Sequence, residues 1–241
     1  MSKSVNKWSV KSAKVVTSLA IGFASLFSTV ASADEADWAN LRAYSQKNSE
    51  LILQGAIQHR VVFMGDSITE FWDKEKSDLF ANPHYVNRGI SGQTTPQMLL
   101  RFRQDVIELR PEVVVILAGT NDIAGNSGPA TNEQIQNNIM SMVDLARANN
   151  IKPVLCAMVP AANYYWAPEL RPAPRIKDIN AWIRAYTRAQ SIDFIDFYAP
   201  MEAEGGALRA AYTNDGVHPN ADGYLVMNEL VKAKLAQIIR N

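Results

Sequence analysis

The segment Val113-Val114-Val115-Ile116-Leu117 is the most strand-like part of the chain, and Gly119-Thr120-Asn121-Asp122 follows it closely. Its five apolar residues are not interrupted by any polar one. A strand with one face in water would alternate apolar and polar side chains, whereas a strand covered on both faces has no reason to alternate. The segment therefore predicts a central strand of a parallel sheet.

Working outward from this strand, apolar and helix-like segments alternate along the chain. Four further strands are predicted at residues 60–64, 85–87, 154–159 and 192–197. Helices are predicted at residues 34–57, from the Thr95 cap and Pro96 to 110, after the capping-box spacing of Thr131 and Gln134, at 175–190, and at 221–239 after Asn220. This order predicts an α/β fold with three layers, in which a five-stranded parallel sheet lies between helices.

The composition excludes several classes of function. The 241 residues are 47% hydrophobic and 20% charged, with equal numbers of basic and acidic residues. The sequence has no basic stripe of the kind that would indicate a nucleic-acid partner. No group of His, Cys and carboxylate residues has metal-ligand spacing, and no phosphate-binding loop of the Walker type is present, so we expect neither a metal nor a cofactor.

The first 33 residues predict a signal peptide. Four lysines precede a mostly apolar run at residues 15–30, and Ala31-Ser32-Ala33 offers a cleavage site of small residues. The alternative is a retained anchor, but the run is short for a membrane span and no stop-transfer pattern follows it. We therefore expect a secreted or periplasmic protein without a stable membrane anchor, whose residues 34–241 form one domain of net charge −4.

One of the three histidines is placed for catalysis. His59 and His84 stand at the beginnings of predicted strands, whereas His218 lies in Asp215-Gly216-Val217-His218-Pro219, after the fifth strand. Ligands of such sheets bind beyond the carboxyl ends of the strands, where His218 is expected. Asp215 is suited to orient one imidazole nitrogen, which leaves the other free to act as a base.

Ser67 is the hydroxyl on which this base would act. It follows the first predicted strand directly, in Gly65-Asp66-Ser67-Ile68-Thr69. A serine needs a neighbouring base to become a good nucleophile, and Ser67, His218 and Asp215 together satisfy the logic of a catalytic triad. The alternative is that Asp66 and Ser67 only cap a helix. A serine can serve both purposes.

Two further segments offer donors for the negative charge that develops during acyl transfer. Gly92 lies in the segment after the second strand, and its missing side chain lets a backbone N–H approach a substrate oxygen. Asn121 lies after the third strand and offers a side-chain amide. Taken alone, each segment is also a typical turn.

Together these four segments resemble the SGNH hydrolase family, also called GDSL-type lipases and esterases, over residues 65–219. The resemblance implies a flavodoxin-like SGNH hydrolase fold, Ser67 as nucleophile, Asp215 and His218 as its partners, and an oxyanion hole formed by Ser67, Gly92 and Asn121. Ile68 stands where the family name has leucine. The segments around Gly92 and Asn121 are most similar to the platelet-activating-factor acetylhydrolase-like branch, which implies short acyl groups such as acetyl.

The substrate stays open at this stage. A serine ester hydrolase acting on a small ester, such as an acylated sugar or lipid, competes with a lysophospholipase, a thioesterase, a carbohydrate acetylesterase and a non-catalytic binding module. Tyr164-Tyr165-Trp166 lies in a long loop at residues 160–174, where it would stack on a sugar, wall an acyl pocket or simply pack the loop. The sequence indicates no oligomeric state.

Other polar residues near the predicted strand ends have structural interpretations. Cys156 lies in an apolar strand and is expected to be a buried core residue rather than a reactive thiol. Asp193 and Asp196 are expected to support local structure, and Asp122 to act behind Asn121. Asn87 and Arg88 flank the predicted pocket without an assignable role.

Overall fold

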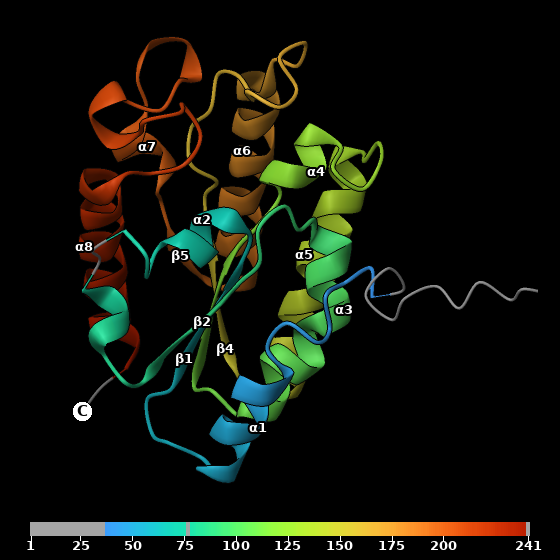
Figure 1. Ribbon diagram of the computed structural model, residues 1–241, viewed down its shortest axis with the longest axis vertical. Helices are drawn as coiled ribbons and strands as arrows, with labels where there is room; N and C mark the ends of the chain where they lie inside the picture. Colours follow the sequence, from blue (N-terminus) through green and yellow to red (C-terminus); the bar gives the residue numbers. More distant parts are fainter. Residues whose placement is uncertain (1–36, 76–77, 240–241) are drawn as a thin grey trace, which may run out of the picture.

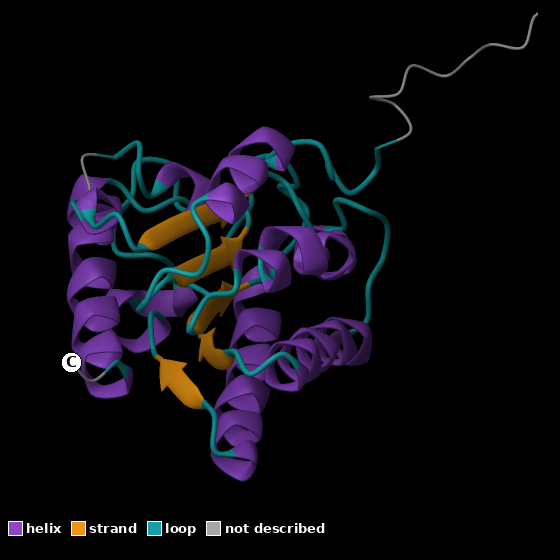
Figure 2. Cartoon of the chain, turned by 90° about the horizontal axis from the view of Figure 1, so that it is seen from below, coloured by secondary structure: helices purple, strands orange, loops and turns teal. Residues whose placement is uncertain are grey.

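The central sheet has five parallel strands in the order β2-β1-β3-β4-β5. The computed structural model describes residues 37–75 and 78–239. The strands are β1 (Val61–Gly65), β2 (Tyr85–Gly89), β3 (Val113–Leu117), β4 (Lys152–Cys156) and β5 (Asp193–Ile195). Figure 2 shows the strands at the centre with helices on both sides of them. This arrangement confirms the predicted fold class, and the strand order is that of flavodoxin-like sheets.

The helices cover both faces of this sheet. They are α1 (Ser45–Leu53), α2 (Ser67–Phe71), α3 (Thr95–Asp105), α4 (Thr120–Ala124), α5 (Asn132–Ala148), α6 (Pro172–Gln190), α7 (Tyr198–Met201) and α8 (Ala221–Ile238). Short 3-10 helices are η1 (Leu79–Ala81), η2 (Ile107–Leu109), η3 (Glu204–Gly206) and η4 (Ala210–Tyr212). Figure 1 shows α8 on one side of the sheet and α3 and α5 on the other.

Successive residues of each strand contribute to two different cores. In β3, Val114 and Ile116 pack in the core that includes α3, α5 and α6, whereas Val113, Val115 and Leu117 pack in the core that includes α8. All five side chains are buried. Because both faces of the strand are covered, no polar position is needed, which explains its uninterrupted apolar sequence.

Several element boundaries differ from the predicted ones for local reasons. The opening helix begins at Ser45 rather than near residue 34, because the Asp37 carboxylate accepts backbone N–H groups of Leu41 and Arg42 in a preceding turn. The cap of α3 is Thr94 rather than Thr95, and the Gln97 side chain accepts its backbone N–H in a capping box. That helix ends at Asp105, and η2 occupies the rest of the predicted span.

The second half of the chain shows smaller shifts. Strand β4 begins and ends earlier than predicted, because its ladder with β3 starts where Lys152 pairs with Val113. Helix α6 begins at Pro172, inside the predicted loop. The predicted caps Thr131 and Asn220 are confirmed, since their side chains accept the N–H of Gln134 and Gly223.

The predicted signal peptide at residues 1–33 lies outside the described residues. Within residues 37–75 and 78–239, none of the helices has the length and apolar character required to cross a bilayer.

The topology places a crevice beside β1. From β1 the chain moves to β2, which is the neighbour of β1 on one side within the sheet. It then crosses to β3, which is the neighbour of β1 on the other side. The strand order therefore reverses around β1, and the carboxyl ends at such a reversal are where open α/β sheets bind ligands. The segments that follow β1, β2 and β3 all reach this edge.

Candidate active site

Ser67 stands at the first position of α2, immediately beyond the end of β1. The Asp66 carboxylate accepts the Ile68 backbone N–H at 2.9 Å and so caps the helix. Gly65 permits the sharp turn, because a Cβ there would lie 2.0 Å from Thr69 Oγ1. The alternative interpretation was that Asp66 and Ser67 only cap a helix. Asp66 is indeed the cap of α2, and Ser67 is the first residue of that helix. The turn presents the Ser67 hydroxyl at the edge of the sheet.

His218 reaches this hydroxyl from the loop before α8. Its Nε2 lies 2.9 Å from Ser67 Oγ, and its Nδ1 lies 2.7 Å from Asp215 Oδ2. The imidazole is mostly buried, with 16% of the side chain exposed. The three residues therefore form a continuous hydrogen-bonded chain from hydroxyl to imidazole to carboxylate, which is the arrangement that activates a serine.

Asp215 is held by its own loop as well as by the imidazole. Its Oδ1 accepts the backbone N–H groups of Val217 and His218, each at 2.8 Å. Partial burial opposes ionisation, but the hydrogen bonds from the His218 side chain and from both backbone groups outweigh it and lower the pKa of Asp215. The carboxylate is thus kept charged and aimed at His218.

The two predicted donor residues lie at the same edge. Gly92 follows β2 and has φ of +76°, a conformation that favours glycine. Asn121 lies in α4, which begins at Thr120 shortly after β3 ends at Leu117, and its side chain is buried. Ser67, Gly92, Asn121 and His218 all line one cavity of about 200 Å³, so the structure brings together the residues that the sequence singled out.

The Asn121 amide is held on both sides. Its Nδ2 donates to the Gln93 backbone carbonyl at 3.1 Å and, in a long contact of 3.4 Å, to Asp66 Oδ2. Its Oδ1 accepts the Asn126 side-chain amide at 2.8 Å. The long contact to Asp66 is the weakest of the three, so it is the one most readily exchanged for a substrate oxygen.

Asp66 is a buried carboxyl that directly precedes Ser67 in the chain. Burial raises the pKa of Asp66 to about 6, although the Ile68 N–H and the nearby His218 partly oppose this shift. The group therefore changes its charge in the mildly acidic range, well above an ordinary aspartate.

Aromatic rings form one wall of the cavity. Phe71, Tyr165 and Trp166 line it, with ring centroids 5.3, 6.5 and 6.4 Å from that of His218. Tyr164 is buried and stacks on Trp166, whereas Tyr165 and Trp166 are 64% and 36% exposed. The loop thus packs through Tyr164 and offers the next two rings to the cavity.

Sequence reasoning missed several residues that line or support the site. Ser91 and Asn126 line the cavity, and the Glu70 carboxylate accepts the Ser91 N–H at 2.7 Å and its hydroxyl at 2.6 Å. Buried Arg101 donates to the carbonyls of Gly65 and Arg88 and to the Gln93 side chain. The position of Glu70, one turn after Ser67 in the α2 segment, was the available signal for one of them.

The remaining polar residues have supporting contacts. Asp122 accepts the Thr95 backbone and hydroxyl donors and so holds the start of α3, whereas its predicted role behind Asn121 stays a prediction. Asn87 donates to the Thr69 carbonyl at 2.6 Å. Asp196 pairs with Arg184 and Asp193 with Lys234, as expected of structural carboxylates.

Arg88 and Cys156 lie away from the cavity. Arg88 is buried and donates to the Asn48 side chain and the Asn87 carbonyl. Cys156 is a buried residue at the end of β4, and burial raises the pKa of its thiol, which confirms the prediction of a core residue rather than a reactive one.

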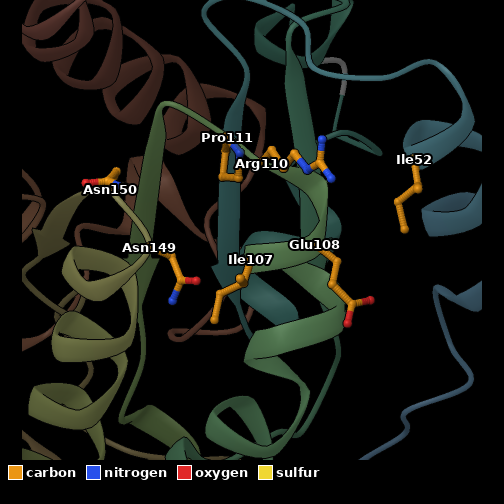
Figure 3. Close-up of a pocket in the computed structure, with 7 residues that line it drawn as sticks. All are labelled: Ile52, Ile107, Glu108, Arg110, Pro111, Asn149 and Asn150. Carbon is orange, nitrogen blue, oxygen red and sulfur yellow. The ribbon is translucent and has the colours of Figure 1, made fainter.

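A larger cavity lies at the opposite end of the sheet. It measures about 700 Å³ and is lined by residues of α1, η2 and the turns before β3 and β4 (Figure 3). Its charged residues are Glu108 and Arg110, and among the described residues no serine, cysteine or histidine lines it. His59 and His84 line another cavity before the strands begin, so neither approaches Ser67. The chemistry of both cavities differs from that of a hydrolase site.

Comparison with known proteins agrees with this geometry. The sequence model of the GDSL-like Lipase/Acylhydrolase family matches residues 63–226. The chain belongs to this family. It is therefore a carboxylic ester hydrolase, and the predicted resemblance is confirmed at this level.

Curated relatives match different shares of this chain and of their own length. Esterase TesA of Pseudomonas aeruginosa is 29% identical over 70% of this chain and 84% of its own length. Platelet-activating factor acetylhydrolase IB subunit alpha1 of Rattus norvegicus is 29% identical over 55% of this GDSL family member and 57% of its own length. The lipoprotein YqeF of Bacillus subtilis is 35% identical, but the match spans only 33% of this chain and 34% of YqeF.

Solved structures of GDSL-type proteins superpose closely. A protein of Bacteroides fragilis described as an acylhydrolase is 45% identical, with a TM-score of 0.80 over 84% of this chain and 99% of its own. A GDSL-like lipase of Bacteroides thetaiotaomicron is 44% identical, with a TM-score of 0.78 over 83% and 98% of the two chains.

Proposed function

We propose that this GDSL family member removes short acyl groups, acetyl foremost, from small-molecule esters through an acyl-enzyme on Ser67. The observation that carries the proposal is the hydrogen-bonded chain from Ser67 through His218 to Asp215, with spacings of 2.9 and 2.7 Å. Gly92 and Asn121 on the same cavity supply the donors that an oxyanion needs.

In the proposed mechanism His218 takes the proton of Ser67 as the hydroxyl oxygen attacks the ester carbonyl. The backbone N–H groups of Ser67 and Gly92 and the Asn121 amide stabilise the resulting oxyanion. His218 then protonates the departing alcohol, which leaves an acyl group on Ser67. His218 next deprotonates a water molecule that attacks this ester, and the acid leaves as the Ser67 hydroxyl is restored.

The size of the cavity supports short acyl groups. Its volume is about 200 Å³, which is below the range of about 300–1,000 Å³ common for sites that enclose whole small ligands. A long fatty acyl chain would have to leave the cavity and run along the surface. A relative named as an acetylhydrolase points in the same direction.

An acylated sugar is the second candidate substrate, and the two exposed rings favour it. Tyr165 and Trp166 line the cavity beside His218, and the ring of buried Tyr164 stacks on that of Trp166. Aromatic faces offer large apolar surfaces against which the C–H groups of a ring-shaped alcohol can pack. The same geometry supports lysophospholipase or thioesterase activity less, because it offers little enclosed space for a long chain.

Hydrolysis of p-nitrophenyl acetate by wild type and Ser67→Ala tests the proposal. We expect the variant to lose at least about 10⁴-fold in kcat, because both nucleophile and acyl-enzyme are removed. The exposed Ser49 in α1 provides the matched control Ser49→Ala, which should retain wild-type activity. A fluorophosphonate should also modify Ser67 covalently. A Ser67→Ala enzyme with most of its activity would contradict the mechanism.

We also propose that the chain is exported to the periplasm or beyond after removal of residues 1–33, and that residues 34–241 form its single domain. The basic start, apolar run and Ala31-Ser32-Ala33 site support this proposal. Intact-mass analysis of protein recovered outside the cytoplasm should give a chain that begins at Asp34. A full-length mass would contradict cleavage.

A further inference from the structure

Asn126 connects two of the proposed oxyanion donors. Its side-chain Nδ2 donates to Asn121 Oδ1 at 2.8 Å and to the Gly92 backbone carbonyl at 3.2 Å. Gly92 follows β2 and Asn121 follows β3, so the two donors come from different segments of the chain. One amide nitrogen thus bridges the two segments at the cavity itself.

The local backbone explains how Asn126 comes to this position. Helix α4 ends at Ala124, and its cap Gly125 has φ of +76°. This left-handed residue reverses the chain, so that the Asn126 N–H donates to the Asn121 carbonyl at 3.0 Å. The Asn126 side chain therefore folds back over the helix that carries Asn121.

The bridge determines which end of the Asn121 amide serves the substrate. An amide has one donor end and one acceptor end. Because Asn126 donates to Oδ1, the Asn121 Nδ2 points the other way, toward the Gln93 carbonyl and Asp66. When one Nδ2 hydrogen leaves the long Asp66 contact for an oxyanion, the bond from Asn126 keeps the amide from turning with it.

We infer that Asn126 is a positioning residue for the oxyanion hole, which holds the Asn121 amide and the Gly92 turn at a fixed separation. The inference rests on the proposed function, because it concerns donors that act only if Ser67 attacks an ester carbonyl and an oxyanion forms. Preorganised donors stabilise a transition state more than a ground state, so losing the bridge should lower kcat more than it raises KM.

Asn126→Ala and Asn126→Asp test the inference with p-nitrophenyl acetate. The alanine variant should lose about 10-fold in kcat with KM changed less than about threefold. The aspartate variant has nearly the same shape but no N–H, and its carboxylate would face Asn121 Oδ1 and the Gly92 carbonyl. The kcat of the aspartate variant should therefore fall about 100-fold, which is within the range seen for removal of an oxyanion donor. A boronic acid that forms a tetrahedral adduct with Ser67 should bind both variants more weakly in the same order.

The double variant Asn121→Ala/Asn126→Ala separates positioning from an independent effect. If Asn126 acts through Asn121, the fold-loss in kcat of the double variant should be clearly smaller than the product of the fold-losses of the two single variants. Asn137→Ala, an exposed asparagine of α5, is the matched control and should behave as wild type. Equal melting temperatures among folded variants would exclude general destabilisation as the cause.

Two results would overturn the inference. One is an Asn126→Asp enzyme with kcat within twofold of wild type, and the other is a double variant that loses the full product. If Ser67→Ala and Asn121→Ala abolish activity while the Asn126 variants do not, only the role of Asn126 fails. If Ser67→Ala stays active, the proposed function fails instead.

Discussion

Ser67 Oγ lies 2.9 Å from His218 Nε2, although 151 residues separate the two in the chain. The parallel sheet brings them together, because the segments beyond β1 and β5 reach the same edge. A second contact fixes this approach: the Tyr224 hydroxyl of α8 donates to the Ile68 carbonyl at 2.7 Å. The helix that carries Ser67 is thereby tied to the helix that follows His218.

Asp215→Asn should lower kcat by about 10³- to 10⁴-fold, because an amide neither stabilises the imidazolium nor enforces the tautomer in which Nε2 is free. KM should change little. Because the pKa of Asp215 lies below 3.8, the wild-type carboxylate is charged throughout the range of an ordinary assay. Steady-state kinetics on an aryl acetate checks this.

Asp193→Asn is the matched control for Asp215, since Asp193 pairs with Lys234 and lies outside the cavity. It should retain activity within about twofold. If Asp215→Asn also stayed within that range, the carboxylate would have no part in catalysis.

Glu70→Ala should lower kcat about 10-fold, because Glu70 holds Ser91 next to Gly92 from the α2 segment that begins with Ser67. Glu70→Gln should stay within about threefold, since its amide oxygen still accepts the Ser91 donors. Partial burial favours the protonated form of Glu70, but the hydrogen bonds from Lys74 and Ser91 outweigh this effect. The pKa of Glu70 is therefore lowered from its ordinary value of 4.5. The stability that it contributes is therefore present above pH 4.5 and is lost as the pH falls through the lowered value.

Lys74→Ala is the control for Glu70, because it leaves the Glu70 contacts to Ser91 in place and removes the exposed ion pair, which contributes little free energy, together with the Lys74 contact over the Phe71 ring. It should change kcat less than twofold. Equal losses for the alanine and glutamine variants of Glu70 would show that the contacts to Ser91 do not matter.

Trp166→Ala should discriminate between the two candidate substrates. Loss of the ring should lower kcat/KM about 10-fold on an acetylated sugar and less than about threefold on p-nitrophenyl acetate, if the ring packs on the alcohol part. Trp38→Ala changes a half-exposed tryptophan that does not line the cavity, and should affect neither substrate. Equal losses on both substrates, or none, would exclude a sugar-stacking role.

Asp66→Asn should stabilise the protein more at neutral than at acidic pH. The folded-state pKa of about 6 lies above the ordinary 3.8, so the native protein holds this proton more tightly than the unfolded chain does. The favourable contribution of protonated Asp66 is complete below pH 3.8 and is lost as the pH rises to about 6. Asparagine resembles the neutral form at every pH.

Urea unfolding of both proteins at pH 4 and pH 7.5 measures this effect. The gain in unfolding free energy from Asp66→Asn should be larger at pH 7.5 than at pH 4 by roughly 2 kcal/mol, at about 1.36 kcal/mol per pKa unit, because the unfolded chain is already partly ionised at pH 4. A gain that does not change with pH would mean that Asp66 titrates normally in the folded protein.

The sequence alone was sufficient for the fold class and for the candidate site residues that the structure brings together at one cavity. The uninterrupted run at residues 113–117 requires a strand with both faces covered, and the structure covers both. Ser67, Gly92 and Asn121 each follow a strand of a parallel sheet, so their approach follows from chain direction alone. The nearness of Asp215 and His218 follows from their separation of three residues.

Only the tertiary structure revealed the supporting contacts. Arg101 and Asn126 are ordinary polar residues in the sequence, and nothing in their spacing indicates which groups they contact. The spacing of Glu70 from Ser67 places it near the site but does not indicate its contact with Ser91. The division of the aromatic loop into a buried Tyr164 and two exposed rings was equally hidden. Such contacts depend on angles and distances between segments that are remote in the chain, and these are decided by how the helices pack on the sheet. The order of residues determines which candidate groups meet at the edge of the sheet, whereas packing determines how rigidly they are held.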